Sequence, residues 1–78
     1  MTLTEPRTRL PIERLIACAK RELAMRKMMY PKRVAQGEMT VAEECDEIDA
    51  MVDIIHLLEV VAGIFATRSR DGAIVHGQ

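Results

Sequence analysis

The sequence predicts an all-α protein built as an antiparallel helical hairpin, and three features of its 78 residues support this fold. Residues 12–29 contain no glycine, proline or asparagine, which gives them strong helix composition. Apolar residues recur there at helical spacing. A helix-ending signal at Gly37 is then followed closely by a helix-starting signal at Thr40. A chain of this length holds one domain.

The first helix is expected to begin at Pro11, after a flexible polar arm over residues 1–9. Proline suits the first helical position because the N–H group that it lacks has no helical partner there. Glu13 follows in the first turn, where negative charge favours the helix dipole. The apolar residues form two rows, one of Ile12, Ile16, Ala19 and Leu23, and one of Leu15, Cys18, Met25 and Met29.

Pro31 predicts a kink or an end of this helix near Tyr30, because its ring clashes with the carbonyl group of Lys27. Proline can also start a further helical turn, which we expect over residues 31–36. Gly37 is a good terminator, since glycine readily adopts the left-handed conformation found at helix C-termini.

The start of the second helix is marked by Thr40 and Glu43, which have the spacing of a capping box. The helix is expected to run from Val41 to about Thr67, with basic residues and Gly72 beyond it. The predicted organisation is a flexible arm over residues 1–9, a helical hairpin over 10–68 and a flexible tail over 69–78.

Charge is divided between the two halves of the chain. Residues 1–36 hold nine Lys/Arg and three Asp/Glu, whereas residues 37–78 hold two and nine. If the turn is centred near residue 38, position i of the first helix faces roughly position 75 − i of the second. The basic and acidic helices then neutralise each other within the hairpin, with Arg26 opposite Asp49.

Two alternatives direct these charges outward to a partner. A basic face would contact phosphate groups, and its residues are Arg21, Arg26, Lys27, Lys32 and Arg33. An acidic face would bind a basic partner, and its residues are Glu43, Glu44, Asp46 and Glu47. The net charge of −1 argues against a protein that coats nucleic acid by bulk charge.

The second helix predicts a homodimer, because its apolar surface over residues 54–66 spans more than half of the helix circumference. One neighbouring helix cannot cover so wide a surface, whereas two hairpins paired into a four-helix bundle can. The predicted interface consists of Ile54, Leu58, Val61, Ala62 and Phe65. The apolar run of about 13 residues is shorter than a membrane span of roughly 20, so we expect no membrane partner.

Little in the sequence points to chemistry. Asp49, Asp53 and His56 share one helix face at a spacing that metal ligands can have, but such residues are more often a solvated stripe. Cys18 and Cys45 lie on apolar rows, and we expect both to be buried free thiols. No catalytic motif occurs. We therefore predict no metal, no cofactor and no enzymatic activity.

One segment carries a family resemblance. Residues 22–40 read ELAMRKMMYPKRVAQGEMT, and residues 47–51 read EIDAM. The chain resembles small proteins encoded by bacteriophages and prophages, with a pattern of roughly ELxMRxxVYPxxVxxGxMT followed by EIxxM. The likeness covers about residues 18–60, and Met29 stands where valine is usual. The resemblance implies a phage origin and a helical hairpin, without an assigned activity.

By analogy, small phage proteins of this type are often accessory factors that bind proteins of the host or the phage. We therefore predict a non-enzymatic accessory protein that acts by binding a host or phage protein. The alternative is a nucleic-acid-associated accessory protein that uses the basic first helix. The first ten residues contain no apolar run of the kind found in a signal peptide, so we expect a location in the cytoplasm of the host cell.

Overall fold

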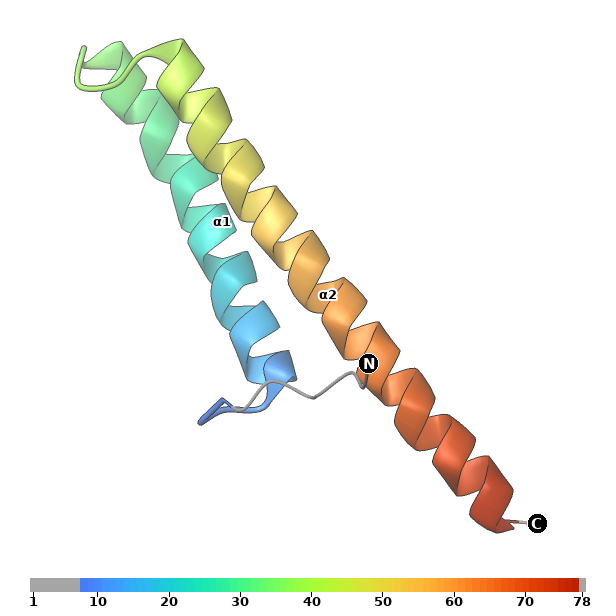
Figure 1. The fold of residues 1–78 in the computed structure, drawn as a ribbon. Helices are drawn as coiled ribbons and strands as arrows, with labels where there is room; N and C mark the ends of the chain where they lie inside the picture. Colours follow the sequence, from blue (N-terminus) through green and yellow to red (C-terminus); the bar gives the residue numbers. More distant parts are fainter. Residues whose placement is uncertain (1–7, 78) are drawn as a thin grey trace.

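The protein is described by a computed structural model, which covers the backbone of residues 8–77 and the side chains of residues 8–66. Two helices, α1 (Ile12–Ala35) and α2 (Val41–Gly77), are joined by a short loop. They lie side by side and antiparallel (Figure 1). The predicted helical hairpin is confirmed, and residues 8–77 contain no strand. Most of the predicted N-terminal arm, residues 1–7, lies outside the described part of the chain.

Pro11 begins α1 from the position just before its first residue. Its φ of −60° and ψ of 151° are extended, and its carbonyl oxygen accepts hydrogen bonds from the N–H groups of Arg14 at 3.0 Å and Leu15 at 3.3 Å. The first helical residue is therefore Ile12, one position later than predicted. Such a shift is within the usual uncertainty of helix ends.

Helix α1 does not end at Tyr30. The helical turn expected after Pro31 is present, and it is continuous with the preceding helix as far as Ala35. Pro31 cannot donate the hydrogen bond that the Lys27 carbonyl would otherwise accept. Because Pro31 is exposed, water can supply the missing partner on this side of the helix.

The loop begins with a Schellman motif centred on Gly37, whose φ is 76°. The Gly37 N–H donates to the Val34 carbonyl at 3.0 Å, and the Glu38 N–H donates to the Arg33 carbonyl at 2.9 Å. These bonds satisfy carbonyl groups that have no partner at a helix end. An ion pair of 3.7 Å between Arg33 and Glu38 spans the same turn.

Helix α2 begins with the predicted capping box. The Thr40 N–H donates to the Glu43 carboxylate at 2.9 Å, and the Glu43 N–H donates to the Thr40 hydroxyl oxygen at 3.1 Å. Two otherwise unpaired N–H groups are thereby satisfied. Glu43 and Glu44 also place negative charge in the first turn, where it favours the helix dipole.

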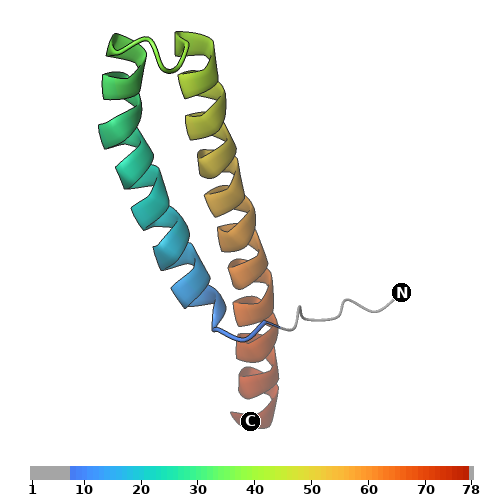
Figure 2. The same cartoon turned by 90° about the vertical axis from the view of Figure 1, so that its left-hand side faces the viewer.

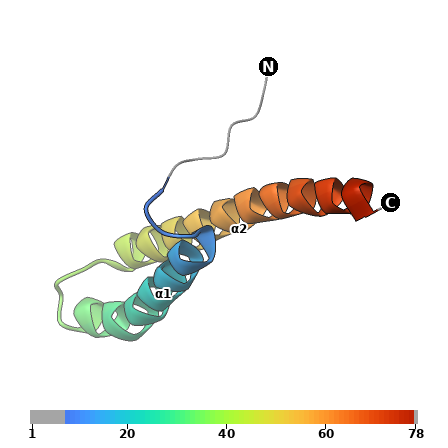
Figure 3. The ribbon, with the colours of Figure 1, turned by 90° about the horizontal axis from the view of Figure 1, so that it is seen from below.

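The predicted end of α2 near Thr67 is wrong, because the helix continues through the predicted tail to Gly77. No proline follows Thr67, and one interior glycine costs a helix only about 1 kcal/mol, so Gly72 does not stop it. At 1.5 Å per residue, α2 is about 55 Å long and α1 about 36 Å. Helix α2 therefore runs well past the start of α1 (Figures 2 and 3), and the molecule measures 61 × 24 × 20 Å.

The core between the helices is small. Among the described side chains only Ala19, Met51 and Ile55 are buried, each at 7% exposure, and Leu23 and Leu58 pack against them. The predicted register puts position 56 opposite Ala19, and the observed core residues Ile55 and Met51 are one and five residues from that position. Two helices thus meet along one narrow seam, and the remaining apolar residues lie outside it.

We expect Gly37→Ala and Gly63→Ala to change stability in opposite directions. Alanine at position 37 would have to keep a φ of 76°, which costs about 1–2 kcal/mol. Gly63 lies inside α2, and nothing is within 4 Å of a methyl group added there, so alanine should stabilise by about 0.5–1 kcal/mol.

Urea unfolding followed by circular dichroism, at one protein concentration, measures both changes. Two changes of the same sign would contradict the left-handed turn at Gly37.

Candidate protein-interaction surfaces

Arg26 on α1 connects the two helices. Its Nε donates to the Glu22 carboxylate at 3.0 Å, and its Nη1 donates to the backbone carbonyl of Glu47 on α2 at 2.8 Å. The Glu47 carboxylate is 3.8 Å from the same nitrogen. The hydrogen bond to Glu22 raises the pKa of Arg26 above its ordinary value. Arg26 therefore holds a fixed charge between the two helices. It contacts Glu47, which is two residues from Asp49, its predicted partner on α2.

Tyr30 lies between two arginines. The guanidinium groups of Arg26 and Arg33 are 5.9 Å and 5.8 Å from the centre of its ring. At this separation a cation over an aromatic face is attracted by the ring quadrupole. Arg26 and Arg33 thus both make contacts inside the hairpin, although the sequence placed them on an outward basic face.

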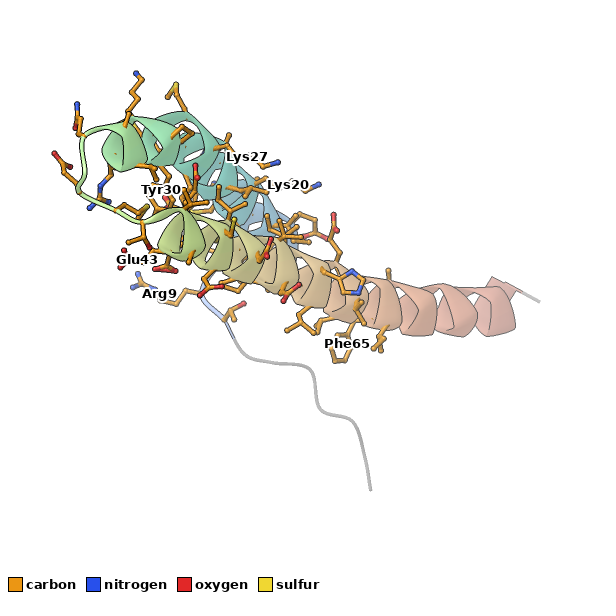
Figure 4. All side chains as sticks on the ribbon, turned by 90° about the horizontal axis from the view of Figure 1, so that it is seen from above. Arg9, Lys20, Lys27, Tyr30, Glu43 and Phe65 are labelled. Carbon is orange, nitrogen blue, oxygen red and sulfur yellow. The ribbon has the colours of Figure 1, made fainter. Side chains whose placement is uncertain are left out.

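The other three members of the predicted basic face are exposed and have no ion pair among the described residues. Lys27 lies with Lys20 on one side of the hairpin, away from Glu43 and Phe65 (Figure 4). Arg21 and Lys32 are eleven residues apart, a spacing that puts them together on the outside of α1. The structure therefore does not bring the five basic residues onto one surface.

The predicted acidic face is also divided. Glu43 is held in the capping box and Glu47 beside Arg26, whereas Glu44 is half-buried and Asp46 is exposed. The backbone N–H and then the hydroxyl group of Thr40 lower the pKa of Glu43, and the charge of Arg33 acts in the same direction. Two of the four acidic residues thus hold the hairpin together.

Two sets of ion pairs define the two sides of the hairpin. Lys20 and Glu59, 3.1 Å apart, mark one side, which we call the Lys20 side. The contacts of Arg26 with Glu22 and Glu47 mark the opposite one, the Arg26 side. Residues three and four apart share a helix face, so steps from these markers show which residues lie on each side.

The Arg26 side carries an apolar stripe that no other part of the described chain covers. Steps of three and four residues from Glu47 define what we call the exposed stripe of α2, which consists of Ala50, Ile54, Leu57, Val61 and Ile64. All of these side chains are exposed except Val61, which is half-buried. The exposed fractions are 46% for Ile54, 63% for Leu57 and 42% for Ile64. Similar steps from Glu22 along α1 reach Leu15, Cys18, Met25 and Met29.

The five residues predicted for the dimer interface fall on two different stripes. Leu58 packs against the buried core, and Ala62 and Phe65 continue its row and are half-buried. Ile54 and Val61 belong instead to the exposed stripe of α2, where Ile54 is exposed and Val61 is half-buried. The prediction missed Leu57 and Ile64. The sequence does show where they belong, because a second apolar row starts at Ala50 and runs beside the row that starts at Ile48.

The outer face of α1 combines exposed methionines with free cations. We give this name to Arg21, Met25, Met28 and Lys32, which follow one another at steps of three and four residues. Met25 is 54% exposed and Met28 is 58% exposed. Methionine usually fills gaps in a core, but these two side chains are directed away from α2.

The structure offers no further chemistry on its described side chains. Asp49, Asp53 and His56 are exposed, and residues 8–66 contain no group of three His, Cys, Asp or Glu side chains placed to hold a metal ion. Cys18 and Cys45 are free and exposed, so their expected burial is wrong. The reason is that the apolar rows that contain these two cysteines lie outside the narrow contact between the helices.

Comparisons with protein-family models, curated proteins and solved structures find no match to this chain. In the part of the chain that the structure describes, neither helix has an apolar stretch long enough to cross a bilayer.

We expect Arg26→Ala to destabilise the hairpin by about 1–2 kcal/mol, because it removes charge-assisted hydrogen bonds on a side chain that is only 22% exposed. Arg21→Ala is the matched control, since Arg21 is exposed and has no ion pair among the described residues, and it should change stability by less than about 0.5 kcal/mol. Urea unfolding of the three proteins gives both values. Equal effects of the two changes would show that Arg26 does not clamp the helices.

The capping box should make stability depend on pH. The folded-state pKa of Glu43 is lowered from its ordinary value of 4.5, so its contribution is present above that value and is lost as the pH falls through the folded pKa. Glu43→Gln keeps the shape of the side chain without its charge. We expect wild type to melt higher than this variant at pH 7 and the difference to shrink below about pH 4.5. A difference that is constant from pH 7 to pH 3 would contradict this role.

Proposed function

We propose that this protein is a phage-encoded, non-enzymatic accessory protein of the host cytoplasm that acts by binding a host or phage protein through the outer face of α1. The observation that carries this proposal is the pairing of Met25 and Met28, both more than half exposed, with the free cations Arg21 and Lys32. The surface fits a partner segment that presents acidic side chains around an apolar centre, such as an acidic amphipathic helix.

The chemistry of the face supports a protein partner. Methionine side chains are unbranched and polarisable, so they adapt to the shape of an apolar partner surface. Arg21 and Lys32 lie on either side of the two methionines along the helix. Complementary charges at the rim of an interface steer association and fix its orientation. An apolar centre between cations is the arrangement that a helix with the opposite charges would match.

The internal contacts of the hairpin explain why these cations are available. Arg26 and Arg33 are used at the seam and at the loop, and Lys20 is paired with Glu59. Arg21 and Lys32 have no such role among the described residues. Their charges are therefore available to the acidic side chains of a partner.

Nucleic-acid binding through α1 is the alternative proposal. Arg21, Lys27 and Lys32 remain free to contact phosphate groups. However, Lys27 lies on the Lys20 side, and exposed methionines separate Arg21 from Lys32. A phosphate-binding surface gains nothing from methionines, whereas a protein-binding surface gains apolar contact area.

Binding of a designed peptide tests the preferred proposal. The probe is a fluorescent amphipathic helix with a leucine stripe flanked by glutamates, and its binding is measured by fluorescence anisotropy. We expect Arg21→Glu with Lys32→Glu to weaken binding about tenfold or more, because attraction becomes repulsion at two positions. The charge-matched control is Arg9→Glu with Lys27→Glu, which lies off this face and should bind like wild type.

Two further results decide between the proposals. A peptide flanked by lysines should not bind, and a tagged chain should retain its partner from a nuclease-treated bacterial lysate but lose it in the Arg21/Lys32 variant. Equal binding of both peptides, or of both double variants, would contradict the proposed surface. Binding to duplex DNA that falls steeply with salt and is lost in the Arg21/Lys32 variant would support the alternative.

A further inference from the structure

We propose that the exposed stripe of α2 binds the same stripe of a second copy of this chain, with the two α2 helices antiparallel and the two loops at opposite ends of a four-helix bundle. This interface lies on the Arg26 side of the hairpin. The exposed stripe belongs to α2, whereas the outer face belongs to α1 and meets the Arg26 side at Met25. The proposal does not rest on the function proposed above.

The spacing of the stripe is that of a helix–helix interface. Ala50, Ile54, Leu57, Val61 and Ile64 alternate in steps of four and three residues, the pattern by which apolar side chains follow a neighbouring helix. The stripe that faces α1 has the same spacing and consists of Ile48, Met51, Ile55, Leu58, Ala62 and Phe65. Helix α2 therefore carries two adjacent interface patterns, and α1 covers one of them.

The surface area of the chain argues for a second copy on the other pattern. The protein exposes 6387 Å², whereas a compact chain of 8.8 kDa exposes about 4,800 Å². The excess of about 1,600 Å² belongs to the whole elongated chain, and a stable dimer of standard size needs about 800 Å² of it from each partner. A symmetric pair of hairpins buries the stripe without requiring any further chain, and symmetric dimers are the commonest oligomers.

The charges on the Arg26 side determine the relative direction of the two copies. On this side Arg26 and Glu47 lie toward the loop, whereas the exposed stripe of α2, at positions 50–64, lies farther along that helix from the loop. If both loops were at the same end, each charged network would be stacked on its own copy and desolvated, which is costly. With the loops at opposite ends and the two-fold axis near Leu57, the apolar segments meet and the charged networks stay outside them.

The length of α2 also favours placing the two loops at opposite ends of the dimer. Antiparallel pairing near Leu57 brings the acidic start of one α2 beside the far end of the other, which extends past α1 to Gly77. That far segment contains Arg68, Arg70 and Asp71 in its sequence. Pairing about Leu57 puts position 68 opposite position 46, so Arg68 and Asp46 supply opposite charges at matched positions, which favours this alignment.

The distance between the loops of the two copies tests whether a second copy binds the stripe and whether the two α2 helices are antiparallel. The sample is the full chain with Cys18→Ser and Cys45→Ser, spin-labelled at Glu38→Cys in the loop and measured by pulsed electron paramagnetic resonance. Residues 41–57 span about 24 Å along α2, so opposite loops should be about 50 Å apart. A distance of about 20 Å or less would overturn the antiparallel arrangement, and the absence of any dipolar signal would overturn the dimer.

Alanine substitution tests the stripe itself. Leu57→Ala truncates one large side chain in each copy and should weaken the dimer about 100-fold in sedimentation equilibrium, since each lost contact contributes about 1.5 kcal/mol. Val52→Ala is the matched control, because Val52 is 44% exposed but lies on the Lys20 side, and it should leave the dimer unchanged.

Unchanged dimerisation of the Leu57 variant, or equal weakening by both changes, would contradict the proposed interface. Both measurements use the purified chain alone. Their failure would therefore leave the proposed function untouched, and failure of the peptide-binding experiment would leave the dimer untouched.

Discussion

Two helices can share only one seam, and the rest of this structure depends on that limit. The seam buries three side chains among those described, and one of them is an alanine. Small domains are marginally stable because they bury a smaller fraction of their surface than large ones do, and an isolated hairpin is an extreme case. The molecule is accordingly held together at discrete points along the seam more than by a continuous core.

Those points lie at the loop and along the Arg26 side. The Schellman motif at Gly37 and the capping box at Thr40 satisfy backbone groups on both sides of the turn. Arg26 reaches across to the backbone of Glu47, and its charge is shared with Glu22 and the ring of Tyr30. Interactions of charged groups with backbone are stronger than exposed ion pairs. The opposite charges of the two helices thus meet at a few positions, and Arg21, Lys27 and Lys32 have no ion pair among the described residues.

Helix α2 has a pattern that a hairpin alone does not need. Its inner stripe follows α1, and its exposed stripe follows at the same spacing one residue earlier along the chain. Helices in four-helix bundles contact two neighbours, and each contact needs its own apolar stripe. The outer face of α1 is a third surface, which meets the Arg26 side at Met25. The proposed dimer and the proposed partner site would therefore use different helices.

Local signals in the sequence determined where the helices begin, where α1 ends and how the chain turns. Gly37, Thr40 and Glu43 act through their own backbone neighbours, so a single sequence is enough to interpret them. The wide apolar surface of α2 could also be predicted, because it follows from the composition of one continuous segment, residues 54–66. The sequence overestimated the stopping effect of Gly72, because a weak local penalty does not end a helix.

The tertiary structure decided which face of each helix meets the other. Periodicity shows that a helix has apolar rows, but it does not show which row a neighbour will cover. The register of α1 against α2 placed Leu58, Ala62 and Phe65 inward and left Ile54, Leu57 and Ile64 exposed. It also engaged Arg26 within the hairpin and exposed Cys18. These outcomes depend on contacts between residues far apart in the chain, and no short segment of sequence contains that information.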